Sequence, residues 1–85
     1  MAQWVYIYDD GEGIISIGLT SYVKKMISDI KGHGKKILYL CPFCTPFDAV
    51  AHKHLLDDLS LRSVTHLIKK HQEQTKIWLN VLKNK

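Results

Sequence analysis

The 85-residue sequence lacks the features that mark secreted and membrane proteins. It has only two cysteines, both in the segment CPFC at residues 41–44, and two cysteines this close together cannot provide a disulfide framework. No apolar run approaches the roughly 18 residues of a membrane-spanning helix. The first ten residues also lack the basic stretch and long apolar segment of a secretory signal. We therefore expect an intracellular, cytoplasmic protein with no membrane partner.

The sequence also lacks low-complexity tracts, internal repeats and linkers, so we expect one domain over residues 1–85. Hydrophobic residues make up 46% of the chain and charged residues 24%, as in ordinary globular domains. The net charge of +4 is uneven, because residues 1–30 hold four acids and two lysines (−2), whereas residues 62–85 hold six bases and one acid (+5). A basic C-terminal third is compatible with binding to an anionic partner such as nucleic acid. The alternative is that these charges form a solvated surface with no binding role.

Residues 3–41 predict two paired strands, a helix and a third strand. QWVYIY and GIISIG are rich in β-branched and aromatic residues, and the glycine-containing DDGEG between them predicts a hairpin turn. From Thr20 the apolar residues follow the helical period, and the glycines of KGHGKK suit the end of that helix. KILYLC, at residues 36–41, predicts the third strand.

Two helices are predicted after the third strand. Thr45 and Pro46 suit the start of a helix with these residues on its core-facing side: Phe47, Val50, Ala51, Leu55 and Leu59. Residues 61–84 predict one long basic amphipathic helix with a heptad-spaced apolar seam over residues 61–82. Four bases at intervals of seven should line one edge of that helix: Arg62, Lys69, Lys76 and Lys83. The order β-β-α-β-α-α predicts an α+β fold, a small three-stranded antiparallel sheet with helices on one face.

The hairpin residues resemble the GIY-YIG nuclease superfamily. WVY in the first strand and SIG in the second lie where that family has Gly-Ile-Tyr-like and Tyr-Ile-Gly-like triplets, with Tyr6 and Ser16 ten residues apart. Three residues match the family's Ile-Gly-x-Thr segment before its first helix: Ile17, Gly18 and Thr20. The resemblance implies a GIY-YIG-like core over residues 1–60.

The resemblance also implies three catalytic groups, of which two are replaced here. Family members cleave phosphodiesters with the first-triplet tyrosine, a helix arginine and a glutamate that binds a divalent metal. Tyr6 matches the tyrosine. The arginine position falls on Met26, just after Lys24 and Lys25, and the glutamate position falls on His52. Lysine lacks the bidentate geometry of arginine, and neutral histidine suits softer metals than Mg²⁺. The resemblance therefore implies a degenerate nuclease, and we expect that the protein is not an active enzyme. If the protein were active, its catalytic set would be Tyr6, Lys25 and His52, with a divalent metal.

Two kinds of macromolecular partner remain open. The first hypothesis is nucleic-acid binding through six bases: Lys24, Lys25, Arg62, Lys69, Lys76 and Lys83. The second is a protein-interaction module, a small regulator or inhibitor of viral or mobile-element type. Such a module would use the apolar seam of residues 61–82 to dimerise or to bind another protein.

The segment CPFC is a further candidate site. Cys41 and Cys44 have the spacing of a zinc half-site, with His52 within reach as another ligand. His52 and His54 cannot both bind one ion, because residues two apart lie about 200° apart around a helix. Reduced thiols and a redox-active pair before a helix are the alternatives to zinc.

Overall fold

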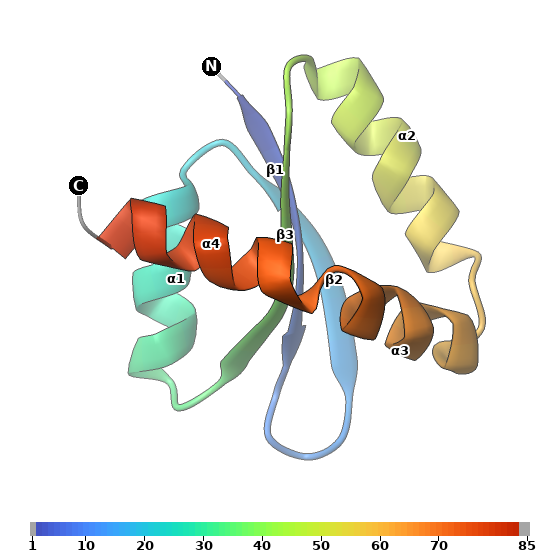
Figure 1. The fold of residues 1–85 in the computed structure, drawn as a ribbon, viewed down its shortest axis with the longest axis horizontal. Helices are drawn as coiled ribbons and strands as arrows, with labels where there is room; N and C mark the ends of the chain where they lie inside the picture. Colours follow the sequence, from blue (N-terminus) through green and yellow to red (C-terminus); the bar gives the residue numbers. More distant parts are fainter. Residues whose placement is uncertain (1, 84–85) are drawn as a thin grey trace.

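The computed structural model describes residues 2–83 as a three-stranded antiparallel sheet with four helices (Figure 1). The strands lie in the order β2-β1-β3: β2 (Ile15–Thr20), β1 (Gln3–Asp9) and β3 (Lys36–Phe43). The helices are α1 (Val23–Gly32), α2 (Pro46–Asp57), α3 (Leu61–Lys70) and α4 (Gln72–Lys83). The predicted α+β class and the three-stranded antiparallel sheet are confirmed. Within the described residues, no helix has the length and apolar composition needed to cross a bilayer.

The β1–β2 hairpin forms where the sequence predicts it. Its connection, residues 10–14, turns through Gly11 and Gly13, whose φ angles are +90° and +83°. These left-handed conformations favour glycine. The carboxylates of Asp9 and Asp10 accept hydrogen bonds from backbone N–H groups of the same loop. Local side-chain chemistry therefore stabilises this turn.

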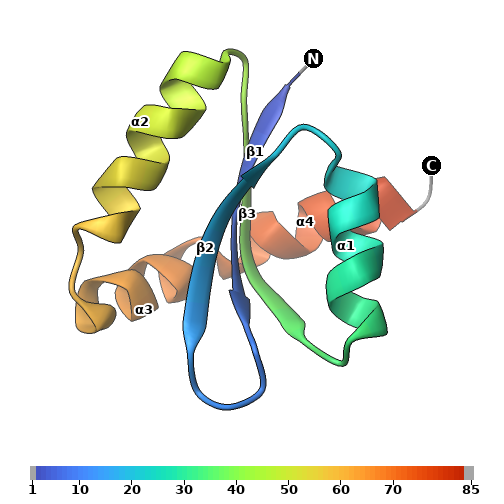
Figure 2. The same ribbon diagram turned by 180° about the vertical axis from the view of Figure 1, so that it is seen from behind.

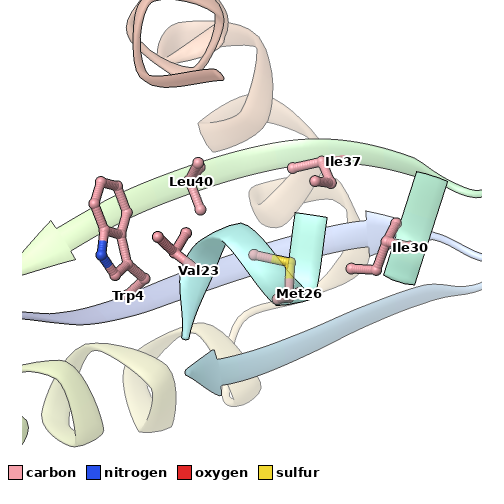
Figure 3. Close-up of a cluster of buried hydrophobic side chains, with 6 residues drawn as sticks. All are labelled: Trp4, Val23, Met26, Ile30, Ile37 and Leu40. Carbon is pink, nitrogen blue, oxygen red and sulfur yellow. The ribbon is translucent and has the colours of Figure 1, made fainter. Parts of the chain in front are cut away.

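The helices cover both faces of the sheet, whereas we expected them on one face (Figures 1 and 2). One core, drawn in Figure 3, lies between the sheet and α1: Trp4, Val23, Met26, Ile30, Ile37 and Leu40. The other lies between the sheet and helices α2 and α3: Val5, Ile7, Tyr39, Ala49, Leu56 and Val64. Successive side chains of a strand point to opposite faces. Since both faces of β1 and β3 are apolar, both faces need a covering layer.

Helix α2 turns a different side toward the sheet from the one that its apolar pattern predicted. Its buried residues are Ala49 and Leu56, which are 0% and 1% exposed. The residues expected in the core are exposed instead: Phe47, Val50, Ala51, Leu55 and Leu59. The side of α2 that faces the sheet contains His52, so in the sequence that side is more polar than the opposite one. In the fold the His52 ring nitrogen bonds the Tyr39 hydroxyl, so this polar group is accommodated there.

The C-terminal segment forms two helices where we predicted one over residues 61–84, and residue 84 lies outside the described part of the chain. His71 separates α3 from α4, with φ −105° and ψ 14°. Its ring packs edge-on against Tyr39, with the centroids 5.9 Å apart. The two helices pass along the β3 side of the sheet, with α3 near α2 and α4 near α1 (Figures 1 and 2). The break removes the continuous helix on which the expected line of four bases depended.

Most of the apolar seam of residues 61–82 packs within the chain, whereas its first residue, Leu61, is 67% exposed. Val64 is buried in the core on the α2 side of the sheet. Trp78, Leu79 and Leu82 pack against the core on the α1 side. Trp78 also meets Trp4 edge to face, with ring centroids 5.2 Å apart. These side chains cover the sheet of their own molecule, so a second chain cannot use them without displacing α3 or α4.

Candidate functional site

A concave surface lies between the β1–β2 hairpin and α1. It forms an open pocket of about 330 Å³. Its polar lining comes from both strands, from the helix and from the connections on either side of the helix: Tyr6, Tyr8, Thr20, Tyr22, Lys25, Asp29, His33 and Lys35. The fold therefore brings Tyr6 and Lys25 of the expected catalytic set to one surface.

Tyr6 lies directly against Gly18, its partner across the β1–β2 ladder. A Cβ atom at position 18 would overlap the Cζ and hydroxyl oxygen of Tyr6. Gly18 does not have a positive φ angle, so this position requires glycine for space rather than for backbone conformation. The SIG segment thus keeps the edge strand open for the phenol.

The Tyr6 phenol is a neutral hydrogen-bonding group at physiological pH. Burial raises its pKa above the ordinary value for tyrosine, and the neighbouring Tyr8 raises it further. The Lys53 ammonium on α2 acts in the opposite direction and lowers this pKa. Because the net shift is upward, Tyr6 keeps its proton and can donate it in a hydrogen bond.

Tyr8 extends the aromatic surface of the pocket. The rings of Tyr6 and Tyr8 are nearly parallel, with centroids 6.0 Å apart and an angle of 22° between their planes. The Lys35 Nζ lies 5.5 Å from the centroid of the Tyr8 ring, within the range of a cation–π interaction. Tyr22, in the connection before α1, is 67% exposed and lines the same pocket. The site thus combines aromatic rings with ammonium groups.

Helix α1 contributes a lysine, a thioether and a carboxylate. Met26, at the position where the resemblance implies arginine, both lines the pocket and packs in the α1-side core. A thioether offers no positive charge there, whereas the preceding Lys25 lines the same pocket. The His33 Nδ1 lies 2.7 Å from the backbone carbonyl oxygen of Asp29. Since a carbonyl only accepts, Nδ1 is the donor in this contact.

His52 does not join this site. Its Nε2 lies 3.0 Å from the Tyr39 hydroxyl, and its ring centroid lies 4.9 Å from that of Phe43. Burial lowers the pKa of His52, and the nearby His71 lowers it further. The structure thus separates His52 from Tyr6 and Lys25, because α2 packs this histidine against the opposite face of the sheet.

The expected zinc ligands are not brought together either. Cys41 is half-buried in the core on the α2 side, whereas Cys44 follows the end of β3 and is exposed. Across residues 2–83, no three His, Cys, Asp or Glu side chains are arranged to hold a metal ion.

The pocket also does not fit the divalent metal that the nuclease resemblance implies. Its lining residues include a single carboxylate, that of Asp29. Mg²⁺ prefers a set of oxygen ligands in near-octahedral geometry. The lysines that line the same pocket, Lys25 and Lys35, would repel a cation. We therefore derive no chemical step through a metal.

The six bases expected to bind nucleic acid fall into three groups. Lys25 lines the concave pocket. Lys24 and Lys83 line a second pocket of about 350 Å³ between α1 and the end of α4, together with Lys31. The others are exposed on α3 and α4: Arg62, Lys69 and Lys76. The six bases are thus divided between two pockets and the exposed sides of α3 and α4.

Sequence reasoning missed four charged or titratable side chains in or near the site: Asp29, His33, Lys35 and Lys53. Lys35 and His33 lie in the KGHGKK segment, whose glycines indicated only a helix end. Because β3 runs antiparallel to β1, with Lys36 opposite Asp9, this segment returns to the hairpin beside Tyr8. The sequence did show two lysines and a histidine just before the third strand. Their position beside the pocket, however, depends on the pairing of β3 with β1, which the sequence alone did not give.

Comparison with known proteins supports the fold. No protein-family model matches the sequence, and a search of curated proteins finds no significant relative. The solution NMR structure of the UPF0213 protein BH0048 from Bacillus halodurans is similar, with a TM-score of 0.62 and 22% sequence identity. The match covers 81% of this chain and 84% of that chain. At this level of identity the similarity shows the fold alone.

Proposed function

We propose that this protein is a nucleic-acid-binding domain on a nuclease-like scaffold, and that its concave surface binds the nucleic acid without cleaving it. The observation that carries the proposal is the gathering of two stacked tyrosines and two lysines in one pocket. Aromatic faces stack on bases, and ammonium groups neutralise phosphates.

The arrangement favours an unpaired strand or strand end. Tyr22 is exposed at the pocket and can stack on a base, while Lys25 on the adjacent helix turn can contact the neighbouring phosphate. The neutral Tyr6 phenol lies deeper and can donate a hydrogen bond to a phosphate oxygen or a base. Bases within a duplex are stacked on each other and would not reach these rings.

Three properties of the pocket favour binding over cleavage. The Tyr6 phenol keeps its proton, because burial raises its pKa. The thioether of Met26 cannot neutralise oxyanion charge as arginine would. The oxygen donors of the pocket do not suit a hard divalent cation. These observations support the degeneracy that the sequence implies.

Fluorescence anisotropy with a labelled single-stranded oligonucleotide tests the proposal. We expect binding at low salt. The logarithm of the association constant should fall linearly as log[salt] rises, with a slope of about −0.7 for each phosphate contacted. The double variant Lys25→Gln/Lys35→Gln should weaken binding at least about tenfold, since it removes both ammonium groups of the pocket.

Lys69→Gln/Lys76→Gln is the matched control, because it removes the same charge from α3 and α4. We expect a much smaller loss of affinity for this variant. An equal loss in both variants would show binding by net charge or by the C-terminal helices. Absence of binding even at low salt would contradict the proposal outright.

A further inference from the structure

The outer side of α2 carries a ridge of exposed apolar side chains. Phe47 is 84% exposed, Val50 42% and Leu55 60%. Phe47, Ala51 and Leu55 follow each other at intervals of four, so they form one ridge along the helix, and the exposed Leu59 follows just beyond the helix end. The ridge exposes about 400 Å² of apolar surface, the size at which a patch on a monomer often has a function.

The ridge has acidic side chains at both ends. Residues 46–58 hold three aspartates and one lysine, a net charge of −2 in a chain of +4. Asp48 lies beside Phe47, and Asp58 lies one turn beyond Leu55, about 15 Å away along the helix. All three aspartates are exposed.

The C-terminal end of α2 is the more strongly negative of the two ends. The Lys53 ammonium lies 2.8 Å from the Asp57 carboxylate and offsets its charge. Asp58 forms no salt bridge within the described chain, and it lies where the helix dipole is itself negative. A cation supplied from outside would therefore be favoured at this end.

These charges disfavour a second copy of the same chain as the occupant. In a symmetric parallel pairing of two α2 helices, Asp48 would meet Asp48 and Asp58 would meet Asp58. In the antiparallel pairing, Asp48 would meet Asp58. Such a dimer would bury only about 800 Å² in total through this ridge, whereas stable interfaces bury about 1,200 Å² or more. Both charge and area point to a different molecule.

We propose that the outer side of α2 binds an amphipathic, basic helix of a partner protein. The partner's apolar side chains would pack along the ridge from Phe47 to Leu55, a length of about 12 Å. Its lysines or arginines would lie beside Asp48 and Asp58. This interaction surface is separate from the concave pocket, which lies beside α1 on the other face of the sheet.

A synthetic peptide of about 15 residues tests the proposal directly. It carries leucines at intervals of four and lysines on both flanks, and a twin carries glutamate in place of every lysine. Anisotropy titration with the whole protein should show binding of the lysine peptide, and at least about tenfold weaker binding of the glutamate twin. Equal affinity for both peptides would overturn the proposal, because it would mean non-specific adhesion to an apolar surface.

Single-residue variants test whether the lysine peptide binds at α2. Leu55→Gln should weaken binding of the lysine peptide, while Ile77→Gln, which changes a similarly exposed residue on α4, should not. Asp58→Lys should weaken it several-fold and also raise the melting temperature, since lysine suits a helix C-terminus. A variant that binds less while melting higher cannot be explained by unfolding.

Two further results would overturn the proposal. One is binding that Leu55→Gln and Asp58→Lys leave unchanged. The other is concentration-dependent dimerisation of the protein alone that Leu55→Gln abolishes, measured by sedimentation equilibrium. That result would assign the ridge to a second copy.

Discussion

Replacing Gly18 by alanine should destabilise the protein, although the same replacement usually stabilises. A glycine that becomes alanine without strain gains about 0.4–1 kcal/mol, because the unfolded chain loses conformational freedom. At position 18 the new Cβ would overlap the Tyr6 ring, which must then move. Overpacking of this kind costs about 1–3 kcal/mol. We expect a net loss of about 1–2 kcal/mol in the free energy of unfolding, from these two effects.

A double-mutant cycle isolates the contact. Tyr6→Leu removes the ring that meets the new Cβ, so Gly18→Ala made in that background should be neutral or stabilising. The coupling energy between the two positions should be about 1–3 kcal/mol, as for other residues in direct contact. Gly32→Ala is the control, since no atom lies within 4 Å of its new Cβ and its φ is not positive. It should stabilise the protein.

Urea unfolding followed by tryptophan fluorescence measures these changes. Trp4 of β1 and Trp78 of α4 are in edge-to-face contact, so their emission reports the opening of the core between sheet and helices. A Gly18→Ala protein as stable as the wild type, or a coupling energy near zero with Tyr6→Leu, would refute the reasoning. It would mean that the Tyr6 ring does not lie over Gly18.

Three other predictions follow from the packing of α2 and from the pocket. Leu56→Ala should lower the free energy of unfolding by about 2–5 kcal/mol, whereas Leu55→Ala should change it by less than about 0.5 kcal/mol; similar losses in urea unfolding would contradict the orientation of α2. Because folding lowers the pKa of His52, the unfolded chain binds more protons, and stability should fall as the pH drops below about 6.5. Thermal unfolding should show a smaller pH effect in His52→Gln than in His54→Gln, and equal effects would be contrary to this assignment. Adding EDTA at constant ionic strength should leave oligonucleotide affinity unchanged, and a large loss would indicate a metal that the pocket residues do not explain.

The hairpin and the strand-to-helix junction could be predicted because their signals are local. Gly11 and Gly13 adopt positive φ angles in the turn, and the change of apolar period after Thr20 precedes α1. Gly18 was identified as part of the Ile-Gly-x-Thr segment before the first helix. The structure gives it another reason, since the missing side chain makes room for Tyr6.

The orientation of α2 could not be predicted from its own pattern. Its most apolar side contains Phe47 and Leu55, and in isolation that side is the better candidate for burial. The sheet instead accepts Ala49, which allows close approach, and His52, whose ring finds the Tyr39 hydroxyl. The hydrogen-bond partner of a polar side chain depends on the tertiary structure, so it cannot be predicted from the periodicity of the helix alone.

The candidate site was only partly predictable for a similar reason. Tyr6 and Lys25 follow from the hairpin and from the helix after it. Lys35 reaches the same pocket because β3 returns along β1, and His52 leaves it because α2 lies on the other face. The resemblance indicated which positions to expect in a catalytic site. The pairing of the strands and the packing of α2 determined which of those positions lie in the same pocket.

The most direct test of the central proposal is an NMR titration of the protein with a short single-stranded oligonucleotide. We predict that backbone amide shifts change most around the concave pocket, in the residues near Tyr6, Tyr8, Lys25 and Lys35, with smaller changes in α3. Shifts confined to α3 and α4, or no shifts at low salt, would contradict the proposal that the pocket beside α1 binds nucleic acid.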